Sequence, residues 1–379
     1  MDDLSLKTIT QRNKGVCPMK KTMTVQREQL LTSIQAIAPG LSPKELIEQS
    51  SCFVIIGNQI ASFNDEITCR APSPFPKKFH GAVPADKITR ILEKIKDDEL
   101  KTVITDGRMT FTGKKDVFWL RMSHEVSLPV EKVKLPKKWH KLPNMFIDAV
   151  TIVQECASKA DEKTGRTAIH ISPTHVEAWD GYQMARFNLK FKRLKDSVLI
   201  RKPTLTHVIN MGVTHYGETS NWFHFKNASD HIISCRRLVE EYEEIEHHFE
   251  VKGKKIVLPK GLAEAADKAG IFSEGDKELD LAVVSIKNGK IYVTSTADTG
   301  GYRGRNKAKF KGEDMEFTIP PTLLKELVHR HNEAILAPGR LKVDGGNWCY
   351  VTALGNPEDL TQGDSDGDSG TDDDGSDTE

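Results

Sequence analysis

The chain has 379 residues, of which 38% are hydrophobic and 28% are charged. This composition is typical of a folded globular protein, and the length fits two or three domains better than one core. No apolar run approaches the roughly 20 residues of a membrane span, and the charged first twenty residues lack the apolar centre of a secretory signal. The six cysteines form no C-x-x-C pair, so we expect reduced thiols in a cytoplasmic protein.

A formal net charge of zero hides an uneven distribution of charge. Between Pro357 and Glu379 ten residues are acidic and none is basic, so the rest of the chain holds 54 basic and 44 acidic residues. A basic body with an acidic tail predicts a polyanionic partner such as nucleic acid, and a solubilising tail is the alternative. We expect residues 357–379 to be disordered and to compete with DNA for the basic body.

The first folded unit is predicted to span residues 23–130, after a polar, aperiodic extension over 1–22 that we expect to be disordered. A helix that follows Pro84 places Ile88, Leu92 and Ile95 on one face. The other expected elements of this unit are a helix over Arg27–Ala38 and strands over Cys52–Ile56, Ile60–Phe63, Lys101–Thr105, Met109–Thr112 and Val117–Arg121.

A lysine-rich segment with two prolines predicts a basic linker over residues 131–143. The second unit, 144–249, is expected to hold helices over Met145–Ala157 and from Lys202, and strands over Thr167–Ile171, Val176–Trp179, Trp222–Phe225 and His231–Cys235. The third unit, 250–356, is expected to hold helices over Pro259–Ala269 and from Pro321 to about His331, and strands over Lys254–Leu258, Leu279–Ile286, Ile291–Ser295, Arg340–Val343 and Trp348–Ala353.

Turn signals recur at nearly constant spacing. Asn58–Cys69, Thr174–Ala185 and Gly289–Gly300 each read as strand and turn, and their aspartates at 65, 180 and 298 are separated by 115 and 118 residues. Prolines at positions 84, 203 and 321, which suit the start of a helix, are separated by 119 and 118 residues. The spacing predicts an α+β fold of three repeated domains, each with two helices backed by antiparallel strands.

This order of elements resembles the bacterial beta sliding clamp, the processivity subunit of DNA polymerase III. The segment Ala178–Ala185 is similar to the family's Thr-Asp-Gly-His-Arg-Leu-Ala segment. Gly81–Ile88 resembles the start of its second helix, Ser234–Glu240 its domain-end motif, and Tyr350-Val351 its last strand. The resemblance covers about Thr24–Asn356, and the remaining ends are an N-terminal extension and the acidic tail.

The resemblance implies the three-domain DNA clamp fold, with two subunits joined head to tail into a homodimeric ring around double-stranded DNA. Such a ring is a processivity factor for DNA replication and not an enzyme: it tethers the replicative polymerase, and a clamp loader is its other protein partner. It also implies a location in the bacterial cytoplasm or nucleoid, or a phage origin, and no contact with membranes. The alternative is a monomeric adaptor of the same fold that binds replication or repair proteins without encircling DNA.

Basic residues on the helices, and in two loops where family members touch DNA, are the candidates for phosphate contacts. A solvated face of an amphipathic helix is the alternative for any one of them, and Asp148 and Glu155 put acidic charge on one helix. The candidates are Arg27, Lys44, Lys87, Arg90, Lys94, Lys163, Arg166, Lys202, Lys260, Lys268, Lys325 and Arg330.

The resemblance also implies an apolar pocket that binds short peptides of the polymerase and the loader. The matching positions, some of which are core residues in the alternative interpretation, are Ile169, Gly181, Tyr182, Gln183, Met184, Leu323, Val343, Ala353 and Leu354. The family's proline after Leu238-Val239 is missing, and Ala353-Leu354-Gly355 replaces its Met-Pro-Met-like end.

Motifs that would bind cofactors or metals fit poorly. Residues 163–166 lack the spaced glycines of a phosphate loop, and Ser369 occupies the glycine position of a calcium loop. His247 and His248 would point to opposite faces of a strand, and no third ligand stands near them or near His329 and His331. The sequence therefore predicts no cofactor, no metal site and no catalytic residue.

Overall fold

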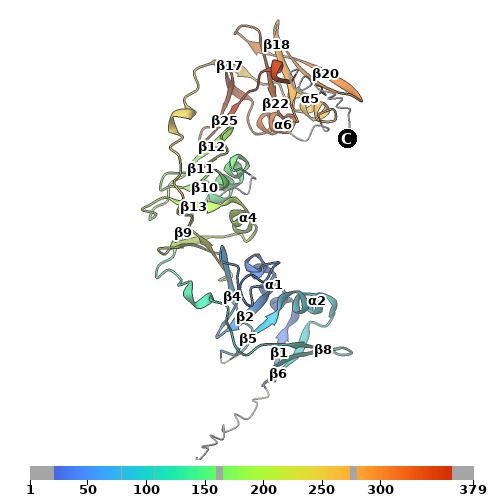
Figure 1. Cartoon of the computed structure of the whole chain (residues 1–379), viewed down its shortest axis with the longest axis vertical. Coiled ribbons are helices and arrows are strands. Elements are labelled where there is room, and N and C mark those ends of the chain that lie inside the picture. Colours follow the sequence, from blue (N-terminus) through green and yellow to red (C-terminus); the bar gives the residue numbers. More distant parts are fainter. Residues whose placement is uncertain (1–20, 78, 106, 159–164, 274–279, 361–379) are drawn as a thin grey trace, which may run out of the picture. The chain divides into compact units, whose positions relative to one another are not determined.

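A computed structural model describes residues 21–77, 79–105, 107–158, 165–273 and 280–360 (Figure 1). The chain divides into two compact units, Met1–Lys141 with Thr206–Arg237, and Leu142–Leu205 with Leu238–Glu379. We call them unit 1 and unit 2. Among the described helices, none has both the length and the apolar character needed to cross a membrane.

Unit 1 contains two antiparallel sheets, with strand orders β1-β6-β7-β8 and β5-β2-β3-β4-β16-β15-β14-β9. Its elements are β1 (Lys21–Gln26), α1 (Arg27–Ile37), β2 (Cys52–Ile56), β3 (Gln59–Phe63), β4 (Ile67–Pro72), β5 (His80–Pro84), α2 (Ala85–Lys94), β6 (Glu99–Thr105), β7 (Arg108–Thr112), β8 (Val117–Arg121), β9 (His140–Lys141), β14 (His215–Glu218), β15 (Trp222–Lys226) and β16 (Ile232–Arg236).

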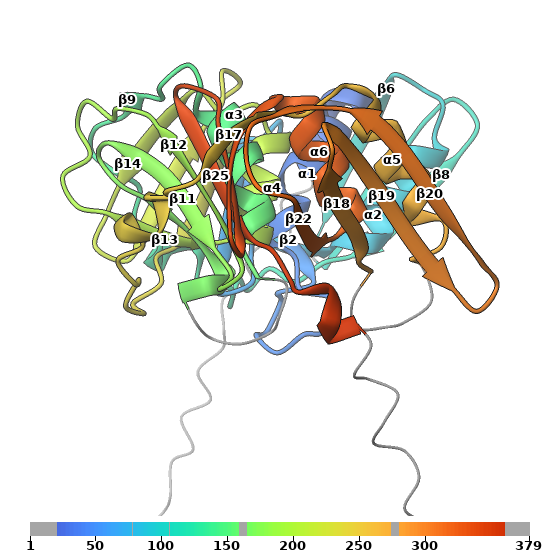
Figure 2. The same cartoon turned by 90° about the horizontal axis from the view of Figure 1, so that it is seen from above.

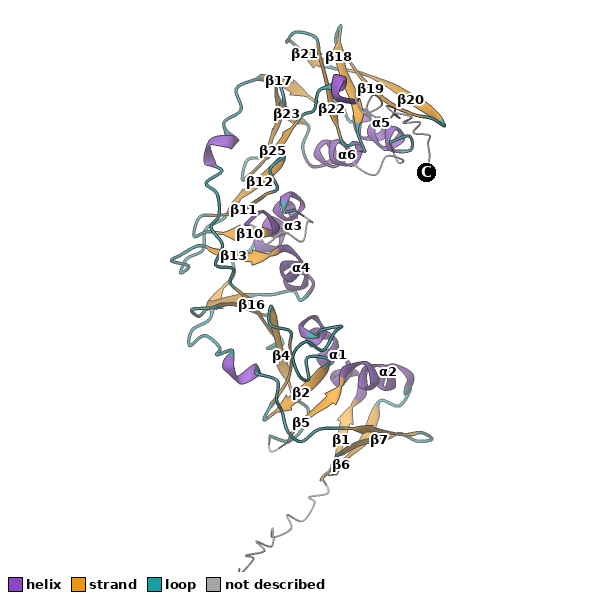
Figure 3. Ribbon diagram, viewed as in Figure 1, coloured by secondary structure: helices purple, strands orange, loops and turns teal. Residues whose placement is uncertain are grey.

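Helical periodicity explains how α1 and α2 pack. Leu30, Ile34 and Ile37 recur along one face of α1 and are fully buried, as are Ile88 and Leu92 on α2. The two helices contact each other, α1 packs on β3 and β4, and α2 packs on β2 and β5. In Figure 3 both helices lie on the same side of the sheet that contains β2 and β4.

Unit 2 also contains two antiparallel sheets, β13-β10-β11-β12-β25-β24-β23-β17-β21 and β20-β19-β18-β22. Its elements are α3 (Phe146–Val153), β10 (Ala168–Ile171), β11 (His175–Trp179), β12 (Gln183–Asn188), β13 (Val198–Arg201), β17 (Lys254–Val257), α5 (Gly261–Gly270), β18 (Ala282–Lys287), β19 (Lys290–Ala297), β20 (Gly300–Lys307), β21 (Lys309–Phe310), β22 (Met315–Ile319), α6 (Pro321–Arg330), β23 (Glu333–Ala337), β24 (Arg340–Asp344) and β25 (Trp348–Ala353). Figure 2 shows the long pair β19 and β20 at one edge of the smaller sheet. The helix α4 (Lys202–Asn210) contains the division between the units.

The predicted repeat of turns is present as three hairpins, β3–β4, β11–β12 and β19–β20. At the second turn Oδ1 of Asp180 accepts hydrogen bonds from the backbone N–H groups of Tyr182 and Gln183, both at 2.9 Å. Gly181 has a φ of +102°, which disfavours a side chain there. At the first turn Asn64 accepts two backbone hydrogen bonds in the same way.

Several local details differ from the expectation. β1 begins at Lys21, two residues before Met23. Pro84 lies one position before α2, whereas Pro203 and Pro321 lie within the first turns of their helices. The expected strand over 279–286 begins only at Ala282.

The histidine pair at 247–248 is not on a strand. Glu246–Phe249 forms a short 3₁₀ helix, so the argument that adjacent side chains point to opposite faces of a strand does not apply. His247 and His248 lie with ring centroids 3.8 Å apart.

The segment expected as a basic linker is partly packed on unit 1. Val130–Lys132 forms a 3₁₀ helix, and Val130 and Val133 are buried with Phe63 and Trp222 in one apolar cluster. Further along, β9 pairs with β14. The acidic tail expected over residues 357–379 begins with another 3₁₀ helix, Pro357–Leu360. Residues 361–379 lie outside the described residues.

Candidate nucleic-acid interface and partner pocket

α2 carries the most regular group of basic side chains. Lys87, Arg90 and Lys94 are exposed, and they lie opposite the buried Ile88 and Leu92. Nζ of Lys87 lies 3.2 Å from the exposed carboxylate of the neighbouring Asp86, a solvent-screened pair that leaves the lysine available for other contacts. The exposed face of α2 therefore presents three cations within two helical turns, and we call it the α2 basic face.

The other candidate in the helices of unit 1 lies in a structural contact. Arg27 is half-buried at the start of α1, and its Nη1 donates to the backbone oxygen of Leu92 at 3.2 Å. That oxygen belongs to the last turn of α2, where a positive charge is favourable. Lys44, by contrast, is exposed in the loop that follows α1.

The cations on α5 and α6 face acidic partners on the same two helices. Lys268 pairs with Glu264 at 2.7 Å, Lys325 with Asp267 at 2.5 Å, and Arg330 with Glu326 at 4.0 Å. Hydrogen bonds from Lys268 and Lys325 lower the pKa values of Glu264 and Asp267 respectively. Lys260 is exposed just before α5. Three cations of this surface thus have acidic partners, whereas among the described residues only Lys87 of the α2 basic face forms an ion pair.

The remaining candidates contribute less to a continuous basic surface. α3 contains Asp148 and no basic residue, as the sequence indicated. Lys202 is half-buried and its Nζ donates to the backbone oxygen of Ala157 at 3.3 Å. Lys163 lies outside the described residues.

Arg166 stacks on the ring of Trp179, with 4.5 Å between its guanidinium carbon and the ring centroid. This is a cation–π contact at the edge of a small cavity of about 140 Å³ in unit 2. We call this cavity the hairpin pocket. It is lined by Trp179, Gly181, Tyr182, Met184, Glu243, His248, Arg340, Val351 and Ala353.

The hairpin pocket has an apolar floor and a polar rim. Trp179, Met184 and Val351 are buried and pack with Ile245 and Phe249, whereas Tyr182 at the rim is 78% exposed. The floor forms because Met184 of β12 pairs with Val351 of β25 in the larger sheet.

His248 covers another part of the pocket. Its ring stacks on Trp179 at a centroid distance of 6.3 Å. Partial burial and the charge of neighbouring His247 lower its pKa below the ordinary value for histidine, which favours the neutral ring.

Gly181, Tyr182, Met184 and Ala353 from the predicted set line this pocket. Ile169 and Val343 are fully buried core residues. Leu354 lines a different cavity of about 880 Å³, together with Phe317 and Leu336. Leu323 is half-buried on α6.

Gln183 lies beside the hairpin pocket and holds its turn together. Its side-chain amide donates to Asp180 and to the backbone oxygen of Glu155, and its oxygen accepts from the hydroxyl of Tyr350.

Trp179, Val351 and Arg340 also line the hairpin pocket but were not among the residues expected there from the sequence. Trp179 directly precedes the predicted turn at Asp180, so the sequence could have indicated it as a lining residue. Arg340 and Val351 are far away in sequence and reach the pocket only through the pairing of β24 and β25 with β12.

The three repeated hairpins, the paired helices and the extended antiparallel sheets together define a DNA-clamp fold, which confirms the predicted fold class. Solved structures with this fold superpose along nearly their whole length. A sliding clamp from Pseudomonas aeruginosa bound to griselimycin shares 12% identity with a TM-score of 0.75, covering 88% of this chain and 99% of that chain. A putative DNA polymerase III beta subunit from Eubacterium rectale shares 15% identity with a TM-score of 0.77, at the same coverage.

A DNA polymerase III beta chain from Streptococcus pneumoniae shares 14% identity with a TM-score of 0.77, covering 89% of this chain and 100% of that chain. Neither a family model nor a curated protein sequence matches the chain. At such low identity the agreement lies in the order and pairing of the elements.

Proposed function

We propose that this protein is a DNA sliding clamp, a non-catalytic processivity factor that encircles duplex DNA and tethers a polymerase to its template. The observation that carries the proposal is the match over 88–89% of this chain and 99–100% of the solved sliding clamps. A protein that kept the fold for another purpose would have no need to keep every repeat at full length. Such a clamp acts wherever the DNA is replicated, which for this family of structures is the bacterial cytoplasm.

The proposed ring is a homodimer that closes through sheet edges. β8 is the last strand of one sheet of unit 1, and β20 is the last strand of the smaller sheet of unit 2. Unpaired edges offer a row of backbone donors and acceptors to a second chain. On β8, Val117 and Trp119 are 52% and 61% exposed, and Ile271 after α5 is 66% exposed. These apolar side chains support pairing of β8 with β20 of a second copy.

The α2 basic face is the part of this surface that we assign to DNA. Lysine and arginine contacts to phosphates carry no sequence information, so they attract duplex DNA while allowing the protein to move along it. The paired charges on α5 and α6 weaken the attraction there, which suits a ring that has to slide.

We assign the hairpin pocket to partner peptides. Its buried Trp179, Met184 and Val351 can accept apolar side chains of a short segment, and its exposed Tyr182 can close over them. The polymerase and the clamp loader are the partners expected to present such segments.

Two measurements test the proposal together. Light scattering gives the native mass, and retention on circular and linearised plasmid DNA after loading gives the topology of binding. A dimer that stays on circles and leaves linear DNA through its ends supports the clamp. A monomer that binds both forms equally contradicts it and favours an adaptor that does not encircle DNA.

A further inference from the structure

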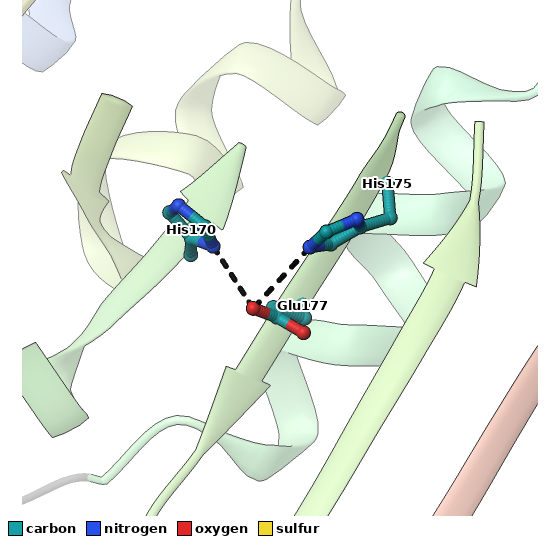
Figure 4. Close-up of side chains that lie close together, drawn as sticks. All are labelled: His170, His175 and Glu177. Atoms are coloured by element: carbon teal, nitrogen blue, oxygen red, sulfur yellow. Dashed lines mark hydrogen bonds and ion pairs between the residues drawn. The ribbon is translucent and has the colours of Figure 1, made fainter. Parts of the chain in front are cut away.

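Three side chains that could hold a metal ion converge on one face of the larger sheet of unit 2 (Figure 4). His170 on β10 pairs directly with Glu177 on β11, and His175 lies two residues before Glu177 on the same face. Nδ1 of His170 lies 2.9 Å from Oε1 of Glu177, and Nε2 of His175 lies 3.4 Å from the same oxygen. All three ligand atoms lie within 4.8 Å of one another.

The distances are close to those that a tetrahedral ion requires. Zn²⁺ binds imidazole nitrogen and carboxylate oxygen at about 2.0–2.2 Å, which places neighbouring ligand atoms about 3.3 Å apart. The contact between His175 and Glu177 already matches this spacing. The two histidine nitrogens lie within 4.8 Å of each other, and side-chain rotations would bring them to the same spacing.

The surrounding contacts prepare the ligand atoms for a cation. Nδ1 of His175 lies 3.1 Å from the hydroxyl of Thr174, which leaves its Nε2 to face Glu177. Arg186 donates to Oε2 of Glu177 at 2.7 Å, so the second carboxylate oxygen, Oε1, faces the two histidines. The ring of His170 stacks on Tyr242 at 4.5 Å, which fixes its orientation.

A cavity of about 580 Å³ opens beside the three ligands. It is lined by glutamates 240, 243, 244 and 246 of the segment after Leu238 and by a single arginine, Arg186, so its charge favours a cation. Among the described residues, Oε2 of Glu240 and the hydroxyl of Tyr242 are buried without a hydrogen-bond partner. A metal-bound water in the cavity would supply such a partner.

We propose that His170, His175 and Glu177 form a Zn²⁺ site whose fourth ligand is a water molecule from this cavity. Two imidazole nitrogens and one carboxylate oxygen are a donor set that suits Zn²⁺. Mg²⁺ and Ca²⁺ bind such a set less well, because they favour oxygen ligands alone. The ion fixes the β10–β11 hairpin and, through the stacked ring of Tyr242, the segment Leu238–Glu246. Since Glu243 of that segment also lines the hairpin pocket, zinc holds one wall of the pocket in place.

Calorimetric titration of the chelator-treated full chain with zinc chloride tests the site. We expect one equivalent to bind, and His170→Ala and His175→Ala each to weaken binding by at least about 100-fold. Co²⁺ in place of zinc should give the visible absorption bands of a tetrahedral ion in the wild type and lose them in both variants. The substitutions are made at the histidines because Glu177 is buried and its replacement could unfold the protein. The side chain of His175 is partly exposed, so His175→Ala is the variant expected to stay folded.

The matched control is a double variant of the other histidine pair, His247→Ala with His248→Ala, made in the same unit. The proposal requires this variant to bind zinc like the wild type, and zinc to raise the melting temperature of both. Absence of stoichiometric binding overturns the site. Binding that survives in His170→Ala and His175→Ala, or that is lost in the control, overturns it as well.

Discussion

The guanidinium group of Arg70 donates hydrogen bonds to the backbone oxygens of Val130 at 2.7 Å and Val133 at 2.6 Å. Arg70 lies on β4 and is 7% exposed, and burial lowers its pKa. One buried cation thus attaches the chain that leaves the first repeat to the sheet of unit 1. This attachment explains why the expected basic linker, residues 131–143, is packed against unit 1 at its N-terminal end.

Replacing this cation should weaken unit 1. Arg70→Met removes the side-chain donor to the Val133 oxygen and one of the two donors to the Val130 oxygen, which keeps the backbone N–H of Val133 at 3.1 Å. We expect a loss of about 3 kcal/mol in the free energy of unfolding, measured by urea titration of the full chain. Arg236→Met is the control, because Arg236 is partly exposed in its pair with Asp65 and should cost no more than about 1 kcal/mol. Equal effects of the two variants would contradict the assigned role of Arg70.

Acid should destabilise unit 1 through His224. Its side chain is fully buried between Ser234 and Thr219, and burial with the nearby charge of Arg70 lowers its pKa to about 3. The unfolded chain therefore binds a proton more readily than the folded chain between about pH 6.5 and about pH 3. Stability is retained above this window and should fall by about 1.4 kcal/mol per pH unit within it.

Thermal melting across this pH range measures the effect of His224. His224→Gln should show a flatter dependence of melting temperature on pH than the wild type, whereas His247→Gln, which changes an exposed histidine, should follow the wild type. If the melting temperature of His224→Gln depended on pH in the same way as that of the wild type, His224 would be excluded as the cause of the acid destabilisation.

Removing the α2 basic face should weaken DNA binding and its salt dependence. For Lys87→Ala combined with Arg90→Ala and Lys94→Ala, the slope of log affinity against log salt should fall by about 0.9 for each lost phosphate contact, measured by fluorescence anisotropy on duplex DNA. The control removes three lysines at positions 252, 254 and 255, on and beside β17. If both triple variants behave alike, α2 has no special role.

The exposed edge of β8 should determine the oligomeric state. Trp119→Glu places a charge on an edge that the proposed ring buries, so we expect light scattering to give the mass of a monomer. Leu46→Glu changes another exposed apolar residue, 87% exposed in a loop, and should leave the dimer intact. A dimer that survives Trp119→Glu would place the interface elsewhere.

Deleting Pro357–Glu379 should raise affinity for DNA. The deletion removes ten acidic residues and no basic one, and with them the expected competition for the basic body. Binding to duplex DNA at several salt concentrations measures the change, which should be largest at low salt. Unchanged affinity and salt dependence would show that the tail does not compete.

The sequence by itself determined the features that depend on local periodicity. The spacing of Asp65, Asp180 and Asp298 predicted three equivalent hairpins, because a turn depends on the few residues that form it. The alternation of isoleucine and leucine with Lys87, Arg90 and Lys94 predicted the amphipathic helix α2 and its basic face in the same way.

Tertiary structure alone decided which of these residues meet. Arg27 and Arg166 fit a basic helix or turn in sequence, but long-range packing places them against Leu92 and Trp179. The hairpin pocket needs Met184 to pair with Val351, and the zinc proposal needs His170 to pair with Glu177. Strand register fixes both pairs, and register depends on the total burial of a sheet face, which no single segment of the sequence contains.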